Sequence, residues 1–280
     1  MILIADSGST KTHWTKISGK CTAEEVFTRG INPFYQDEKD ISDLIEQQLL
    51  PAMSSRQTDA IFFYGAGCSF PEKKALVSKS LGQHFPDVVI EVQSDLLGAA
   101  RSLFGREAGI ACILGTGSNS CYYNGKDIMQ NVSPLGYILG DEGSGAVLGK
   151  KLVADVLKNQ LPERLKQKFM DQFGLKPADI LENVYKKAFP NRYLARFTPF
   201  LKENLDEPCI VEIVYCGFRD FVRRNLKQYE YPGTEVRFTG SVAFHFSEIL
   251  EQVMLEEGLF MGGITQNPMQ GLIDYHLETV

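Results

Sequence analysis

The sequence predicts an α/β fold made of two domains with similar topology, and three observations support this prediction. A chain of 280 residues with 44% apolar content is long enough for two hydrophobic cores. Strand-like and helix-like segments alternate, which is typical of an α/β sheet. The order strand, Gly/Ser turn, strand, Gly-Lys turn, strand occurs twice, which indicates a duplication. We expect domains at residues 1–106 and 107–280.

The first domain is expected to open with three antiparallel strands. The wholly apolar run Ile2 to Ala5 predicts a buried strand that ends in a tight turn. Thr12 to Ile17 and Thr22 to Thr28 are strand-like, and Ser18-Gly19-Lys20 between them is a turn signal. Strands and helices then alternate in the order helix 41–49, strand 60–64, helix 74–81, strand 88–92 and helix 95–104.

The second domain is expected to begin with the strand Ile110 to Leu114, followed by a Gly/Ser turn and two further strands up to Val132. The apolar pattern then predicts helices at 142–157, 210–229 and 242–257, with a strand at 235–238 before the last of them. No low-complexity linker separates the halves, so ordered structure should join them.

Composition excludes several classes of function. The 29 Lys and Arg residues are outnumbered by 35 Asp and Glu residues, so the net charge is −6 and nucleic acid is not an expected partner. No apolar run approaches the roughly 20 residues that span a bilayer. The six cysteines form no CxxC pair and are expected to be reduced, and the His and Cys spacings fit no structural zinc site. We expect a cytoplasmic protein with no membrane partner.

The segment Asp6-Ser7-Gly8-Ser9-Thr10-Lys11 directly follows the first buried strand. Small residues in such a turn expose backbone N–H groups that can hold phosphate oxygens, and a carboxylate such as Asp6 can hold Mg²⁺ through water. A plain hairpin turn capped by an Asp would have the same sequence pattern. The segment Gly115-Thr116-Gly117-Ser118-Asn119 offers a similar turn in the second half, and the pairing of the two favours a phosphate site over two plain hairpins.

Three further segments carry candidate polar groups. Asp95 follows a strand, where a carboxylate could accept the proton of a substrate hydroxyl, although helix N-capping is the simpler interpretation. Asp141 and Glu142 lie among four glycines at the expected start of a helix, which suggests close backbone approach to a ligand, or only helix capping. Gly240-Ser241 lies between a strand and a helix whose N-terminus could meet a nucleotide.

The segment Tyr64 to Ser69 resembles part of a dinucleotide-binding motif. Phe70 replaces its third glycine, however, and no acid ends a second strand at the expected distance, so we reject that function.

The order of these motifs resembles BadF/BadG/BcrA/BcrD-type ATPases, and among them the N-acetylglucosamine kinases, of the sugar kinase and actin superfamily. The resemblance spans nearly the whole chain, and Leu139-Gly-Asp-Glu-Gly-Ser144 is its most specific part. It implies two duplicated ribonuclease H-like, or actin-like ATPase, domains with a central cleft. ATP and Mg²⁺ would be the cofactors and a small sugar the substrate, and a homodimer is left open.

The resemblance also implies roles for individual residues. Asp95 would be the catalytic base, and the sugar would be bound by Asn32, Asp95, Ser118, Gly136 and Asp141. ATP and its phosphates would be bound by Gly8, Ser9, Thr10, Lys11, Gly115, Thr116, Gly117, Ser118, Gly240 and Ser241, with Asp6 holding Mg²⁺ through water.

The sequence departs from the family pattern at one place that bears on the sugar. Where amino-sugar kinases often have Gly-Trp-Gly, this chain has Pro134-Leu135-Gly136, so the aromatic platform is missing or replaced by Tyr137. We expect phosphorylation of an amino sugar, first of all N-acetylglucosamine. The alternatives are an ATPase that activates an iron–sulfur enzyme, which would need clustered thiolates, and a sugar or nucleotide sensor without catalysis.

Overall fold

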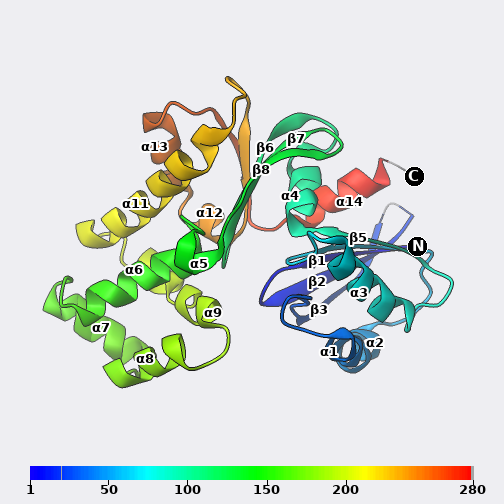
Figure 1. Cartoon of the computed structure of the whole chain (residues 1–280), viewed down its shortest axis with the longest axis horizontal. Coiled ribbons are helices and arrows are strands. Elements are labelled where there is room, and N and C mark those ends of the chain that lie inside the picture. Colours follow the sequence, from blue (N-terminus) through cyan, green and yellow to red (C-terminus); the bar gives the residue numbers. More distant parts are fainter. Residues whose placement is uncertain (20, 279–280) are drawn as a thin grey trace. The chain divides into compact units, whose positions relative to one another are not determined.

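The computed structural model describes residues 1–19 and 21–278 (Figure 1). Contacts divide the chain into two compact units. The first unit contains Met1–Gly109, Tyr123–Met129 and the C-terminal segment from Asn267, and the second contains Ile110–Tyr122 and Gln130–Gln266. Each unit is therefore made of segments that are not continuous in sequence. The division of the chain at residue 106 stays a prediction.

The first sheet has the strand order β3-β2-β1-β4-β5. Its strands are β1 (Ile2–Ser7), β2 (Lys11–Ser18), β3 (Cys21–Arg29), β4 (Ala60–Gly65) and β5 (Val89–Ser94). β1 pairs antiparallel with β2 and β2 with β3, as expected for the opening meander, while β4 and β5 are parallel to β1. Lys20 of the predicted turn lies outside the described residues.

The second sheet has the order β10-β9-β6-β7-β8. Its strands are β6 (Ala108–Leu114), β7 (Ser118–Asn124), β8 (Ile128–Val132), β9 (Val236–Thr239) and β10 (Met261–Thr265). Read from β8, the sequence order 8-7-6-9-10 matches the order 3-2-1-4-5 of the first sheet. β6, β9 and β10 are parallel, like β1, β4 and β5. The predicted duplication is therefore confirmed.

The helices of the first unit are α1 (Glu38–Leu44), the π-helix η1 (Ile45–Leu49), α2 (Leu50–Ala52), α3 (Pro71–Gly82), α4 (Asp95–Phe104) and α14 (Met269–Leu277). α4 begins directly after β5, with Ser94 as its N-cap, and buries an apolar face that includes Leu97 and Leu103. α14 adds Met269, Leu272 and Ile273 to a cluster with Ile4 and Ile17 of the first sheet. The last helix thus completes the core that the first strand begins.

The second unit contains α5 (Gly136–Leu139), α6 (Gly145–Leu157), α7 (Glu163–Phe173), α8 (Pro177–Tyr185), α9 (Pro190–Ala195), α10 (Thr198–Glu203), α11 (Pro208–Arg224), the 3-10 helix η2 (Leu226–Gln228), α12 (Ser241–His245) and α13 (Ser247–Glu256). A proline lies in the first turn of each of α8 to α11, where its missing N–H costs no hydrogen bond. One core cluster joins these helices to β6 and β9.

Two predicted helices have different limits in the structure. The helix expected from Glu142 begins at Gly145, because Asp141 and Gly143 have φ values of 56° and 71°, which no right-handed helix contains. The helix expected over 242–257 is the pair α12 and α13, which meet at Phe246.

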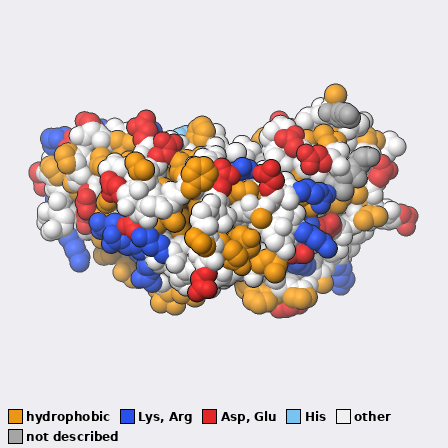
Figure 2. Space-filling view, turned by 90° about the horizontal axis from the view of Figure 1, so that it is seen from above, with side chains coloured by type: hydrophobic (Ala, Val, Ile, Leu, Met, Phe, Trp, Pro, Cys, Tyr) orange, Lys and Arg blue, Asp and Glu red, His pale blue; other side chains and the backbone are white. Residues whose placement is uncertain are grey.

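Within the described residues, every helix is too short or too polar to cross a bilayer. Figure 2 shows acidic and basic side chains interspersed with apolar ones over the face that it draws.

Candidate active site

The turn after β1 is fixed by contacts with the segment that follows β3. Gly8 N donates to Lys11 O at 3.1 Å and closes the turn. Ser7 Oγ accepts from the N–H of Ile31 and donates to its carbonyl, both at 3.0 Å. A Cβ at Gly30 would lie 2.4 Å from the carbonyl oxygen of Gly8, so only glycine permits this approach. The small residues predicted to bind phosphate therefore form one ordered turn.

Asn32 lies immediately beyond this contact and is buried, with 7% of its surface exposed. Its Oδ1 accepts from Phe34 N at 3.0 Å, and its own N–H donates to Gln36 Oε1 at 2.6 Å. Gly67, at φ 82°, passes so close that a Cβ there would lie 2.4 Å from Asn32 Oδ1. The loop after β4 is held in turn by Ala66 N, which donates to Ser7 O at 2.8 Å.

Asp95 is the first residue of α4, at the carboxyl end of β5. Ser94 caps the helix by accepting from Leu97 N at 3.2 Å, so the Asp95 carboxylate is not the cap. Burial raises the pKa of Asp95 to about 6, although the N–H of Leu96, which donates to Oδ1 at 2.9 Å, lowers it. A base with such a pKa is suited to proton transfer near neutral pH.

Asp6 is electrostatically coupled to Asp95. Burial, and then the charge of Asp95, raise the pKa of Asp6 to about 7, against a lowering by Lys11. Two carboxylates that repel each other in a part-buried place attract a cation. Among the described residues no group of three or more His, Cys, Asp or Glu side chains could hold a metal. A single carboxylate such as Asp6 fits Mg²⁺, which keeps several waters and takes further ligands from phosphates.

In the second unit the turn after β6 is joined to the start of α6. Gly115 N donates to Gly117 O at 2.9 Å, and the N–H groups of Gly145 and Ala146 donate to the carbonyls of Gly115 and Thr116 at 2.8 and 3.0 Å. The predicted phosphate turn 115–118 is thus held by the first residues of a helix.

Asp141 lies against the same turn. Its Oδ1 accepts from Ser118 N at 3.3 Å, and a Cβ at Gly117 would lie 3.3 Å from its Oδ2. Burial raises the pKa of Asp141 to about 6, and the Ser118 N–H lowers it. Glu142 differs, because it pairs with Arg224 at 2.6 Å and so fastens this segment to the end of α11.

Gly240, which follows β9, lies against the carboxyl end of β6. Its φ is 119°, and a Cβ would lie 2.3 Å from Leu114 O, so glycine is required. Gly136, at φ 74°, begins α5 and has open space around its Cα. Pro134 O accepts from Asp141 N at 2.8 Å, which ties the segment of Gly136 to Asp141.

The structure therefore brings the predicted site residues together in two groups, one in each unit. The first unit gathers Asp6, the turn 8–11, Asn32 and Asp95. The second gathers the turn 115–118, Asp141 and the pair Gly240 and Ser241, with Gly136 close in sequence.

Sequence reasoning missed the surroundings of Asn32. Lys73 Nζ donates to Pro33 O at 2.7 Å, and Lys74 Nζ donates to Gln93 Oε1 at 2.6 Å, two residues before Asp95. Both lysines lie in the first turns of α3, where the helix dipole disfavours cations. That unfavourable placement was the signal in the sequence that could have identified them.

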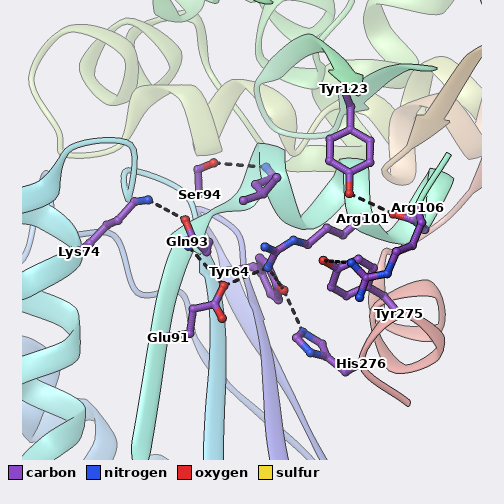
Figure 3. Close-up of polar contacts among 12 residues, drawn as sticks. Tyr64, Lys74, Glu91, Gln93, Ser94, Arg101, Arg106, Tyr123, Tyr275 and His276 are labelled. Carbon is purple, nitrogen blue, oxygen red and sulfur yellow. Dashed lines mark hydrogen bonds and ion pairs between the residues drawn. The ribbon is translucent and has the colours of Figure 1, made fainter. Parts of the chain in front are cut away.

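A polar network supports α4 from the side of α14 (Figure 3). Arg101 donates to Tyr64 Oη at 2.8 Å and to Glu91 Oε1 at 3.0 Å, and Tyr64 Oη pairs with His276 Nε2 at 2.8 Å. Burial lowers the pKa of His276 to about 4, so its ring is neutral near pH 7. The network ties the helix that begins with Asp95 to two strands and to the C-terminal helix.

The doubled sheet, with a glycine-rich turn after the first strand of each copy and part-buried carboxylates beside it, is the architecture of an actin-like ATPase fold. No protein-family model matches the chain. The chain is 49% identical to a proposed N-acetylglucosamine kinase of Porphyromonas gingivalis, with a TM-score of 0.97 over 99% of both chains. It therefore belongs to the N-acetylglucosamine kinase family and is an ATP-dependent sugar kinase.

Two further proteins are similar to the chain. The chain is 28% identical over 209 residues to an N-acetylmuramic acid/N-acetylglucosamine kinase of Clostridium acetobutylicum, covering 69% of this chain and 67% of that protein. A proposed N-acetylglucosamine kinase of Chromobacterium violaceum has a TM-score of 0.73 at 17% identity over 98% of both chains, which supports the fold.

Proposed function

We propose that this chain transfers the γ-phosphate of ATP to a hydroxyl group of N-acetylglucosamine, as a member of the BadF/BadG/BcrA/BcrD-type group. The observation that carries the proposal is the 49% identity, over 99% of both chains, to the proposed N-acetylglucosamine kinase of Porphyromonas gingivalis. The carboxylates and glycine-rich turns of each unit support it, because phosphoryl transfer needs a base, a phosphate-binding backbone and a cation.

In the first unit Asp95 accepts the proton of the acceptor hydroxyl, and Asn32 binds the sugar. Oδ1 of Asp95 is held by the Leu96 N–H, so the carboxylate is oriented before substrate arrives. Gly8 closes the phosphate-binding turn through its bond to Lys11 O, and Ser9, Thr10 and Lys11 bind phosphate oxygens. Asp6 holds Mg²⁺ through water, and bound Mg²⁺ would neutralise charge on the phosphates.

In the second unit the turn of Gly115, Thr116, Gly117 and Ser118 binds phosphate through the N–H groups of Thr116 and Gly117, because Gly115 N and Ser118 N already donate within the protein. Gly240 and Ser241 bind the adenosine. Ser118, Gly136 and Asp141 contact sugar hydroxyls. Asp141 is suited to this because its carboxylate is fixed against the turn by Ser118 N and still has unused acceptor positions.

The test is a coupled assay of ADP release from Mg-ATP with N-acetylglucosamine, glucosamine, glucose and no sugar. We expect release that depends on N-acetylglucosamine and falls by about 10²–10⁴ in Asp95→Asn, with ATP binding retained in calorimetry. Sugar-independent release would instead favour an ATPase activator, and undiminished turnover by Asp95→Asn would remove Asp95 from the mechanism.

A further inference from the structure

The loop that carries Asn32 has an unusual border of exposed aromatic rings and lysines. Phe34 and Phe70 are 53% and 52% exposed, and their ring centroids lie 6.1 Å apart in an edge-to-face arrangement. Lys73 Nζ lies 5.3 Å from the centroid of Phe34. We call Phe34, Phe70 and Lys73 the aromatic-lysine cluster.

The cluster is continuous with the proposed sugar site of the first unit. Phe34 N donates to Asn32 Oδ1, and a Cβ at Gly67 would lie within 2.9 Å of Phe34 as well as 2.4 Å from Asn32 Oδ1. Lys73 Nζ donates to the carbonyl of Pro33, the residue between Asn32 and Phe34. A sugar bound to Asn32 would therefore lie next to the aromatic-lysine cluster.

The positive charge of this border is not neutralised by protein carboxylates. Lys73 and Lys74 donate to neutral acceptors, Pro33 O and Gln93 Oε1, and neither forms an ion pair within the part of the chain that the structure describes. Lys79 of the same helix, by contrast, pairs with Glu38 at 2.8 Å. An ammonium group has three donors, so Lys73 has two beyond its bond to Pro33.

We propose that the aromatic-lysine cluster is a subsite for a carboxylate-bearing substituent on the amino sugar. The ammonium of Lys73 binds the carboxylate, with Lys74 adding positive charge, and the exposed faces of Phe34 and Phe70 cover the apolar part of the substituent. This inference rests on the proposed function, because it assumes that Asn32 binds the sugar. It makes Lys73 a specificity residue, with no part in the phosphoryl transfer itself.

The experiment compares three sugars that differ only in this substituent. N-acetylmuramic acid is N-acetylglucosamine with a lactyl ether that carries a carboxylate, and its methyl ester removes the charge at nearly the same shape. We would measure kcat/KM for all three with the natural chain, Lys73→Met, Lys73→Arg and, as the matched control on the same helix, Lys79→Met. Melting temperatures would show that each variant is folded.

We expect the natural chain to use the acid better than its ester. Lys73→Met should lose about tenfold to a hundredfold in kcat/KM on the acid, the usual loss for a hydrogen bond to a charged group, and little on N-acetylglucosamine. Lys73→Arg should recover much of this loss, and Lys79→Met should behave like the natural chain.

Two results would overturn the subsite while leaving the proposed function intact. One is turnover of N-acetylglucosamine but not of the acid by the natural chain. The other is an equal loss on all three sugars in Lys73→Met, which would mean that Lys73 only braces the loop through Pro33 O. Absence of turnover with every sugar would overturn the proposed function and the subsite with it.

Discussion

The carboxyl group of Asp95 should set the acid limb of the pH profile. Its pKa, raised by burial to about 6, separates an inactive protonated form at lower pH from an active carboxylate at higher pH. We expect kcat/KM for N-acetylglucosamine to fall at least about tenfold per pH unit below pH 6. It should level off only above about pH 7, where Asp6, which would hold Mg²⁺, is also ionised. Rates between pH 5 and 8 would test this, and a profile that stays flat to pH 5 would contradict it.

The same carboxylate should reduce the stability of the fold. The pKa of Asp95 is higher in the folded state than the ordinary value of 3.8 for an exposed Asp. Between those pH values the folded chain therefore binds more protons and loses stability as pH rises. At pH 8 the cost is fully present, and Asp95→Asn should raise the free energy of unfolding by at most about 3 kcal/mol.

Urea titrations of Asp95→Asn at pH 8 and pH 4 would measure this gain, which should nearly vanish at pH 4. The exposed Glu46→Gln serves as the control and should change neither value. A variant that is less stable than the natural chain at pH 8 would show that the Asp95 carboxylate makes contacts worth more than its burial costs.

Gly67 gives a second residue-scale prediction. Gly67→Ala places a Cβ at φ 82° and 2.4 Å from Asn32 Oδ1, so it should displace Asn32 and raise KM for the sugar. The backbone strain alone costs about 1–3 kcal/mol. Gly233 is a matched control, because its φ is 77° but a Cβ there would meet nothing within 4 Å. Gly233→Ala should lose similar stability without a change in KM, and equal KM values for both variants would count against the contact with Asn32.

At the scale of elements, the start of α6 depends on one hydroxyl. Ser144, fully buried, accepts from Val147 N at 3.2 Å and ends the left-handed segment around Asp141. Ser144→Ala should cost about 0.5–2 kcal/mol in urea unfolding. Ser247→Ala, at the start of α13, where the structure shows no side-chain cap, should cost less than about 0.5 kcal/mol. Equal losses would mean that the cap does not stabilise α6.

The elements that could be predicted from sequence are those set by near neighbours. The run Ile2 to Ala5 and the strand-like segments after it gave the opening meander, because each strand pairs with the next along the chain. The start of α6 could not be predicted, since an Asp at φ 56° looks in sequence like an Asp in a helical first turn. The site residues themselves stay predictions, although the structure gathers them around each turn.

At the scale of the whole molecule, the pairing of α14 with the first sheet could not be predicted from sequence. His276 forms a hydrogen bond with Tyr64, which lies 212 residues earlier in the sequence. No local sequence pattern indicates a contact between residues so far apart. The duplication was predictable because two similar turns, at Gly8-Ser9 and Gly117-Ser118, each follow an apolar strand. Long-range strand pairing could therefore be predicted from sequence only where the chain repeats the same order of elements.

The C-terminal helix should be essential to the first unit. Met269, Leu272 and Ile273 are buried there, and removing them would cost about 1.5–3 kcal/mol each, a large part of the stability of an ordinary domain. A chain that ends at Gln266 should therefore melt far below the full chain or fail to fold, as circular dichroism would show. An unchanged melting temperature would contradict this.

This dependence of the first strand on the last helix bears on how the protein is made. Domains generally fold as the ribosome releases them, N-terminal part first. Here the sheet that carries Asp6 and Asp95 emerges early, yet the part of its apolar surface around Ile4 and Ile17 stays uncovered until residues 269–277 have been synthesised. The sheet can therefore hold Asp6 and Asp95 in their final setting only after residues 269–277 have left the ribosome.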